Sequence, residues 1–116
     1  MFEAQSRWAN RPATLPPVLI GGDIILSPSR RVVLIKDTEV VLQKKEFAIL
    51  QLLMANKGHF MEPGQLLRKV WDSDYMEADN KNLYKTINRL RNKISEVSPN
   101  KEYIKVEREI GYKFIE

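Results

Sequence analysis

The segment from Gln43 to Asn56 is apolar around nearly its whole circumference, and this feature constrains the fold more than any other. Its apolar residues are Phe47, Ile49, Leu50, Leu52, Leu53 and Met54. The pair Lys57-Gly58 then supplies a signal that ends a helix. A helix that is apolar on most sides must be buried on most sides. We therefore predict that this helix is the structural centre, in contact with a sheet and with other helices.

The size and composition of the chain narrow the class of protein. Its 116 residues suit one domain with a modest core, and it contains no cysteine and one histidine. That composition excludes a disulfide framework and most histidine-based zinc sites. No apolar run approaches the roughly 20 residues that span a bilayer. Met1 to Asn10 lacks the apolar core of a signal peptide, so a cytoplasmic location is the expectation. The net charge of +4 weakly favours an anionic partner.

The region before the central helix divides into a tail and a sheet. Residues 1–17 contain three prolines and show no periodicity, which predicts a linker or flexible tail before a domain at 18–116. From Val18 to Leu42, short β-branched runs alternate with turn signals, which predicts an antiparallel sheet of three or four strands. Such a sheet is too small to stand alone, so one of its faces must pack on helices.

Two further helices are predicted after the central one. The first begins at Pro63 and runs to about Trp71, with an apolar stripe along one side. The second, Lys81 to Ile94, carries five Lys or Arg residues and no Asp or Glu. Its apolar residues Leu83, Ile87, Leu90 and Ile94 recur at helical spacing. One face can therefore be buried, and the cationic face is either ordinary solvated surface or a binding surface for a polyanion.

The segments on either side of this cationic helix differ in character. Asp72 to Asp79 holds four acidic residues, which suit a helix N-terminus with Asp79 as N-cap, or an exposed loop for protein docking. A polar connection from Glu96 to Glu102 follows the helix. Tyr103 to Val106 and Tyr112 to Ile115 then read as two strands joined by a charged turn. This terminal hairpin fits the wing of a winged helix.

Five blocks of sequence, in order and at consistent spacing, resemble the DNA-binding effector domain of OmpR/PhoB-type response regulators over Val18 to Ile115. Leu26 to Val33 resembles the strand-turn-strand of that family, and Leu42 to Leu50 resembles its L-T-x-x-E-F-x-L-L entry to the first helix. Gln65 to Trp71 is similar to the second helix. Ile87 to Ile94 is similar to the I-S-R-L-R-R-K-L recognition helix, and Arg108 to Lys113 to the R-G-x-G-Y-R wing.

The resemblance implies an α+β fold, a winged helix-turn-helix with an N-terminal antiparallel sheet, three helices and a C-terminal hairpin wing. It also implies sequence-specific binding of double-stranded DNA, with a recognition helix at about 80–95 in the major groove and a wing at 103–115 at the minor groove. The phosphoacceptor receiver domain that usually precedes this module is not in the sequence. The chain is therefore either an excised fragment or a stand-alone regulator.

Several positions depart from the family pattern. Gln43 stands where a Thr usually caps the first helix together with Glu46, and we expect a small stability cost because Gln is a poorer N-cap. Tyr84, Lys85 and Asn88 replace the usual residues of the recognition helix, so the preferred DNA sequence should differ. Glu109 replaces the first wing glycine and puts an acid near the duplex.

The chemistry of DNA recognition assigns roles to exposed donors on the third helix and the wing. The candidates are Lys81, Asn82, Lys85, Thr86, Asn88, Arg89, Arg108, Tyr112 and Lys113. Arg89 can pair with guanine and Asn88 with adenine. Lys81 and Lys85 are expected to neutralise phosphates, and Lys85 could also reach a base. Thr86 and Tyr112 could donate hydrogen bonds to the DNA backbone. By the resemblance, Arg108 would enter the minor groove.

Arg91 lies nearer the core edge, and an intramolecular salt bridge and a phosphate contact are both open for it.

The partners follow from the same resemblance. By the resemblance, the acidic loop occupies the position that contacts RNA polymerase in activators. The residues expected to make this contact are Asp72, Asp74, Tyr75 and Glu77. The same charges could instead repel misplaced DNA. The family often binds direct repeats as tandem dimers, so we expect a tandem dimer on DNA.

Other classes of function have weaker support in the sequence. It shows no glycine-rich phosphate loop, no nucleophile with a nearby His and no calcium loop, so we expect no enzyme activity, cofactor, metal, membrane contact or small-molecule substrate. The alternative function is a winged helix used for protein interaction or RNA binding, because a fold does not fix a function. Five uncompensated cations on one helix favour DNA.

Overall fold

The protein has the predicted order of a sheet, three helices and a terminal hairpin. The computed structural model describes residues 18–71 and 80–115. The elements are β1 (Leu19–Gly21), β2 (Ile24–Ser27), β3 (Val32–Ile35), β4 (Thr38–Val40), α2 (Lys44–Ala55), α3 (Pro63–Trp71), α4 (Asn80–Val97), β5 (Ile104–Glu107) and β6 (Gly111–Phe114). The predicted tail at 1–17 and the acidic segment at 72–79 lie outside the described residues. No described helix is both long and apolar enough to cross a membrane.

The four N-terminal strands form one antiparallel sheet in the order β1-β2-β3-β4, as the turn signals predict. Side chains alternate between its faces, and Ile24, Leu26, Val33 and Ile35 are all buried on the side of the core. A two-residue loop, residues 36–37, joins β3 to β4, and both of its residues have positive φ, at 51° and 67°. This conformation is that of a type I′ turn, whose twist matches the flanking strands.

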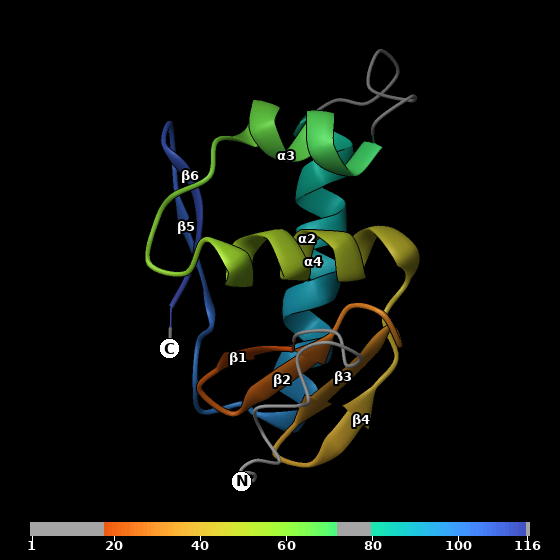
Figure 1. Cartoon of the computed structure of the whole chain (residues 1–116). Helices are drawn as coiled ribbons and strands as arrows, with labels where there is room; N and C mark the ends of the chain where they lie inside the picture. The colour runs from red at the N-terminus through yellow and green to blue at the C-terminus, as the bar shows by residue number, and fades with distance from the viewer. Residues whose placement is uncertain (1–17, 72–79, 116) are drawn as a thin grey trace, which may run out of the picture.

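Helix α2 is the centre of the domain, which confirms the prediction from its apolar circumference. It contacts α3, α4, β1 and β6. In Figure 1 it lies across the middle of the molecule, between the sheet at one end and α3 at the other, while α4 runs lengthwise behind it. Its buried apolar residues are Phe47, Ile49, Leu50, Leu53 and Met54. The largest share of the core therefore forms around one helix.

Helix α4 is longer than the sequence predicts. It extends to Val97, so the prediction that a connection begins at Glu96 is wrong. Val97 is partly buried against the core, and this packing favours a helix that is two to three residues longer than predicted. The N–H of Ser98 still donates to the carbonyl of Ile94 at 2.9 Å. Pro99 then stops the helix, because the residue before a proline disfavours helical backbone angles.

The wing is a hairpin of β5 and β6 that is also tied to the loop between α2 and α3. Ile104 pairs with Phe114 and Glu107 with Gly111, so β5 and β6 each start and end one residue from the predicted limits. The N–H of Met61 donates to the carbonyl of Tyr112 at 2.7 Å, and the N–H of Tyr112 donates back at 3.0 Å. Gly111 has φ 146°, and a Cβ there would collide with the Met61 carbonyl. The wing requires glycine at this position.

Candidate nucleic-acid interface

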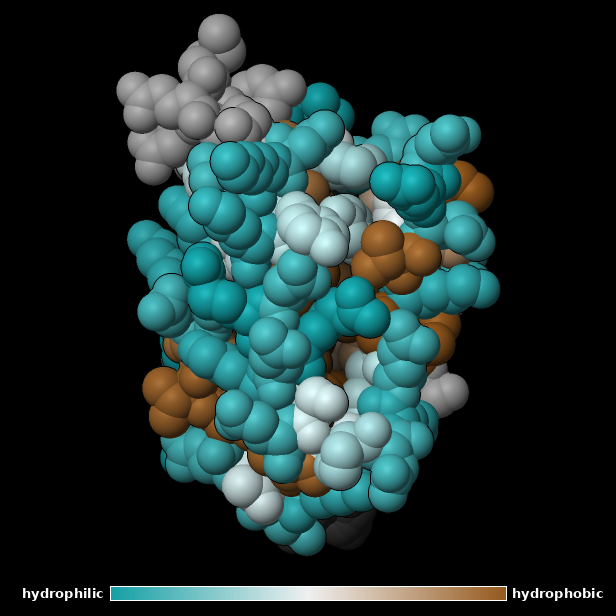
Figure 2. All heavy atoms as spheres, turned by 180° about the vertical axis from the view of Figure 1, so that it is seen from behind, coloured by the Kyte–Doolittle hydropathy of each residue, from teal (hydrophilic) through white to brown (hydrophobic). Residues whose placement is uncertain are grey.

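Helix α4 has the two faces that its sequence predicts. Leu83, Ile87, Leu90 and Ile94 are at most 4% exposed and fix the helix to the core. The exposed residues on its other side include Lys81, Asn82, Lys85, Arg89 and Asn92. The surface seen from behind, over which α4 runs, is mostly hydrophilic (Figure 2). Anchoring on one side leaves a rigid row of donors on the other.

A hollow of about 360 Å³ lies at the corner where α2, α3 and α4 meet. The described residues that line it are Lys45, Trp71, Asn82, Lys85, Thr86 and Arg89. Three of these six are cations and none is acidic, so the hollow suits an anion. Four of the predicted DNA contacts meet here. Lys45 was missed by the sequence reasoning, because only the tertiary structure brings α2 beside α4.

Two side chains of this corner are held by local contacts. The ammonium of Lys45 lies 5.2 Å from the centre of the Trp71 ring, which is a cation–π distance. Thr86 is 4% exposed, and its hydroxyl donates to the carbonyl of Asn82 at 2.9 Å. The single hydroxyl proton of Thr86 is thus bonded within the helix. This hydrogen bond favours a role for Thr86 in positioning the N-terminal turns of α4.

Glu46, in the first turn of α2, is buried beside the exposed face of α4. Its side chain is 1% exposed. Oε1 accepts hydrogen bonds from the Gln43 N–H at 2.9 Å and from the Lys93 ammonium at 2.7 Å, and Oε2 accepts one from Arg89 Nε at 3.4 Å. Burial acts to raise the pKa of this carboxyl, but the bonds from Lys93, Gln43 and Arg89 outweigh it and hold the pKa below its usual value. Glu46 is therefore ionised at neutral pH.

The sequence reasoning gave Glu46 only a capping role for α2. The N–H of Gln43 does donate to it, as that role requires. Its contacts with Arg89 and Lys93 were missed because those residues lie 43 and 47 positions further along the chain. One signal was present in the sequence. Arg89 and Lys93 are four residues apart on α4, so they share a face, and Glu46 is the acidic residue of the mostly apolar central helix.

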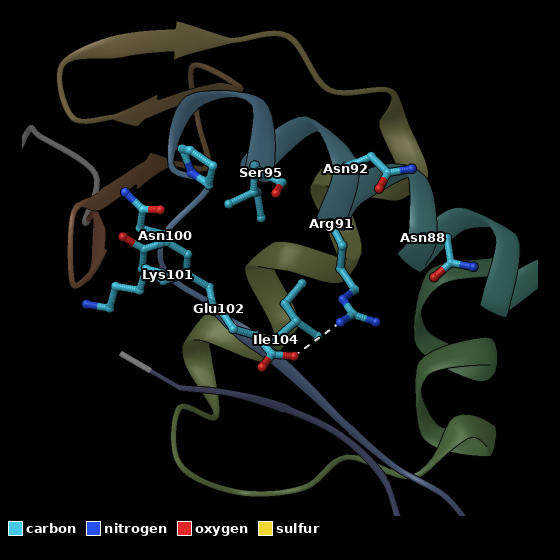
Figure 3. Close-up of a pocket in the computed structure, with 11 residues that line it drawn as sticks. Asn88, Arg91, Asn92, Ser95, Asn100, Lys101, Glu102 and Ile104 are labelled. Carbon is cyan, nitrogen blue, oxygen red and sulfur yellow. Dashed lines mark hydrogen bonds and ion pairs between the residues drawn. The ribbon is translucent and has the colours of Figure 1, made fainter.

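A second hollow, of about 640 Å³, separates the C-terminal half of α4 from the segment that leads into β5. In Figure 3, Asn88, Asn92 and Ser95 lie along α4 on one side of it, and Asn100 and Lys101 lie on the segment that leads into β5.

An ion pair crosses this second hollow. Arg91 donates to Glu102 at 3.1 Å, and the two side chains are 37% and 58% exposed. Of the two roles left open for Arg91, the structure contains the intramolecular salt bridge. A pair this exposed contributes little to stability.

The cationic side chains of the wing occupy different environments. Arg108 is exposed in the turn between β5 and β6. Lys113 is partly buried, with its ammonium 4.5 Å from the centre of the Phe60 ring. Tyr112 is 7% exposed. Burial and the nearby Tyr84 raise the pKa of the Tyr112 phenol although Arg91 acts in the opposite direction, so the hydroxyl stays protonated.

Glu109 occupies a backbone conformation that explains why a glycine is usual at this position of the wing. Its φ is 72°, in the left-handed region, which is strained for residues with a side chain. The strain is of the order of 1 kcal/mol. Glu109 is exposed, so its carboxylate faces solvent at the wing turn.

The structure thus groups the predicted DNA contacts in four places. Asn82, Lys85, Thr86 and Arg89 line the corner hollow, Asn88 lines the second hollow, and the remaining described contacts lie at the start of α4 or on the wing. The predicted polymerase contacts Asp72, Asp74, Tyr75 and Glu77 lie outside the described residues. Within residues 18–71 and 80–115, no three His, Asp or Glu side chains are grouped to hold a metal ion.

These features define a winged helix-turn-helix protein. They are the N-terminal sheet, the three helices with α2 at their centre, the hairpin bridged to the loop between α2 and α3, and the cationic face of the third helix. A family profile described as "Transcriptional regulatory protein, C terminal" matches residues 37–114. The chain belongs to this family, which confirms the resemblance to OmpR/PhoB-type effector domains.

Relatives in sequence are transcription and signalling proteins. The chain is 38% identical over 96 residues to the sensory transduction protein RegX3 of Mycolicibacterium smegmatis, covering 83% of this chain and 42% of RegX3. It is 36% identical over 107 residues to the alkaline phosphatase synthesis transcriptional regulatory protein SphR of Synechococcus elongatus, covering 92% of this chain and 41% of SphR. The chain therefore spans less than half the length of these relatives.

Solved structures share the fold. The DNA-binding domain of Klebsiella pneumoniae RstA, in complex with the RstA box, is 26% identical with a TM-score of 0.72, over 84% of this chain and 96% of that one. Thermotoga maritima DrrB, an OmpR/PhoB homologue, is 27% identical with a TM-score of 0.73, over 85% of this chain and 44% of DrrB. These similarities confirm the predicted winged-helix architecture.

Proposed function

We propose that this chain is the DNA-binding effector domain of a bacterial response regulator, and that it binds a specific sequence of double-stranded DNA. The observation that carries the proposal is the cationic hollow at the corner of α2, α3 and α4, beside an α4 surface with no acid from Lys81 to Ile94. Family membership and the likeness to RstA, which was solved with its DNA box, support the same function.

In this proposal α4 enters the major groove and the wing contacts the minor groove. A DNA phosphate occupies the corner hollow, where Lys45 and Lys85 neutralise it and Asn82 donates a hydrogen bond. Lys81 contacts a phosphate nearby. Arg89 and Asn88 contact base edges, and Arg108 reaches into the minor groove from the wing turn.

The wing and the surrounding assembly complete the proposal. Tyr112, protonated and mostly buried, donates to the DNA backbone beside Lys113. The acidic residues Asp72, Asp74 and Glu77, with Tyr75, contact RNA polymerase, and two copies bind direct repeats as a tandem dimer with half-sites about one helical turn apart. RegX3 and SphR are more than twice as long as the region matched. By the family resemblance, a receiver domain would control this module if it is part of a longer response regulator.

The assignment of Arg89 to base contact is tested by replacing it with Ala. A sequence selected from a random pool of duplexes first defines the cognate site. Arg89→Ala should then reduce the ratio of cognate to scrambled affinity by about five- to a hundredfold, since a bidentate base contact contributes about 1–3 kcal/mol of discrimination. Lys81→Ala, the matched phosphate contact, should weaken binding to both duplexes equally. An unchanged ratio in Arg89→Ala removes Arg89 from base reading.

Salt dependence separates DNA binding from the alternative of a protein-interaction module. Four or five phosphate contacts should give a slope of about −4 in a plot of log affinity against log salt concentration, because each neutralised phosphate releases counterions. Titration of a labelled duplex at several salt concentrations measures this slope. Binding that does not change with salt contradicts the proposal, and equal affinity for a matched RNA duplex favours the RNA-binding alternative.

A further inference from the structure

The buried carboxylate of Glu46 has more donors than a helix cap requires. The cap uses one oxygen lone pair, for the Gln43 N–H. The other two donors come from α4, from Arg89 and Lys93, which lie one helical turn apart. A carboxylate buried under a cationic helix surface is costly unless it is fully paired. The pairing therefore fixes both cations relative to the core.

The contact with Arg89 involves Nε and not the end of the guanidinium. Nε lies 3.4 Å from Glu46 Oε2, while the Arg89 side chain remains 54% exposed. An arginine that reads guanine in an end-on bidentate contact uses its two terminal nitrogens. Holding the side chain by Nε restricts its rotamers without using those nitrogens.

Lys93 makes the stronger contact with the same carboxylate. Its ammonium is 2.7 Å from Oε1 and its side chain is 31% exposed. Because Lys93 and the Gln43 N–H both bond to Oε1, Oε2 is left to Arg89. Oε1 thus bonds to the start of α2 and to Lys93, and Oε2 bonds to Arg89 on the surface proposed to face DNA.

We propose that Glu46 is a positioning residue for DNA recognition: it holds Arg89 through Nε and so sets the guanidinium in the orientation that discriminates between bases. This inference rests on the proposed function, because it requires that Arg89 contacts a base. Pre-ordering a long side chain also lowers the entropy cost of binding. The carboxylate has a second effect, since it compensates part of the charge of Arg89 and Lys93 when no DNA is bound.

The test is Glu46→Gln in the 116-residue chain, which keeps the size of the side chain and removes its charge. The ratio of cognate to scrambled affinity should fall about three- to tenfold, a part of the loss expected for Arg89→Ala. Affinity for the scrambled duplex should be unchanged or slightly higher, because two cations lose their compensating anion. A residue with a merely structural role would lower both affinities together.

The matched control is Glu102→Gln, which releases Arg91 from its ion pair with the same change in charge. It should leave the cognate-to-scrambled ratio within twofold of the unsubstituted chain. The double variant Glu46→Gln, Arg89→Ala should discriminate no worse than Arg89→Ala alone, because the two residues act on one contact. Additive losses of discrimination in the double variant would overturn the proposal.

Two results separate this proposal from the proposed function. If the unsubstituted chain does not discriminate between DNA sequences, the proposed function fails. If it discriminates and Arg89→Ala loses the discrimination while folded Glu46→Gln retains it, only the positioning role fails.

If Glu46→Gln does not fold, hydrogen exchange measured by NMR on the unsubstituted chain tests the same proposal. The Nε–H NMR signal of Arg89 should exchange with water at least tenfold more slowly than that of the exposed Arg108. Equal exchange rates would overturn the proposal.

Discussion

Two arginines on the same helix, two residues apart, make ion pairs of opposite character. Arg89 contacts Glu46, whose side chain is 1% exposed, at the corner of α2 and α4. Arg91 contacts Glu102, whose side chain is 58% exposed, across the hollow between α4 and β5. The second distance is shorter, 3.1 Å against 3.4 Å. The burial of the acid, and not the length of the contact, therefore decides how much an ion pair contributes.

The reason lies in the solvent around each carboxylate. Water solvates Glu102 whether or not Arg91 is near it, so the pair gains little. Glu46 has lost its water and depends on three donors from the protein. Removing it leaves two cations and a backbone N–H without their acceptor. The α2–α4 corner should therefore respond to substitution far more than the α4–β5 hollow.

The largest expected effect is on stability. Glu46→Ala should lower the free energy of unfolding by about 2 kcal/mol, below the 3–5 kcal/mol of a fully buried pair because Arg89 and Lys93 are partly solvated. Glu102→Ala should lower it by less than about 0.5 kcal/mol. Urea denaturation at pH 7 measures both values. Equal losses in the two variants would contradict the role assigned to burial.

A smaller effect is expected from the pH dependence of the buried Glu46 ion pair. The folded pKa of Glu46 lies below its ordinary value of 4.5, so its stabilising contribution is fully present above that pH and is lost as the pH falls through the folded pKa. The difference in unfolding free energy between the unsubstituted chain and Glu46→Gln should therefore narrow from pH 7 to pH 3. Urea titrations at the two pH values measure it. A difference that widens toward acid would mean that the carboxylate destabilises the fold.

The smallest expected effect concerns salt. An exposed pair is screened strongly at high ionic strength, where the Debye length falls to about 3 Å at 1 M salt. At about 0.05 M salt, Glu102→Gln should lower the free energy of unfolding by a few tenths of a kcal/mol, which is typical of an exposed pair. At about 1 M salt this loss should disappear. The loss in Glu46→Gln should persist. Thermal denaturation across this salt range is the measurement. Parallel salt responses of the two variants would contradict the assigned difference between the buried and the exposed ion pair.

Local patterns in the sequence predicted most of the fold. The stripe of α4 has the period of a helix, the short β-branched runs between turn signals indicated the strands of the sheet, and the apolar circumference of α2 indicated a helix buried on most sides. The end of α4 was missed because Val97 is held by packing against the core. The strain at Glu109 was not visible either, although its place in a glycine position of the wing was the clue.

The candidate site was predicted in part. Sequence reasoning found the cations of α4, because their spacing places them on one exposed face. It did not find Lys45, which joins Lys85 and Arg89 at the corner hollow only when α2 packs across α4. Nor did it predict that Thr86 turns its hydroxyl back to Asn82. These arrangements depend on where the helices pack against one another, which no local sequence pattern encodes.

Hydrophobic periodicity and charge are local properties of the chain, so they were enough to predict the class of the protein and the face of α4 that remains in solvent. Which cations are constrained depends on how the helices pack. The tertiary structure placed Glu46 of α2 beneath Arg89 and Lys93, more than 40 residues away in the chain, and excluded water from the carboxylate. The physical reason is that desolvation depends on what packs around a group, so an acid that looks like a helix cap becomes the anchor of the proposed DNA-reading arginine.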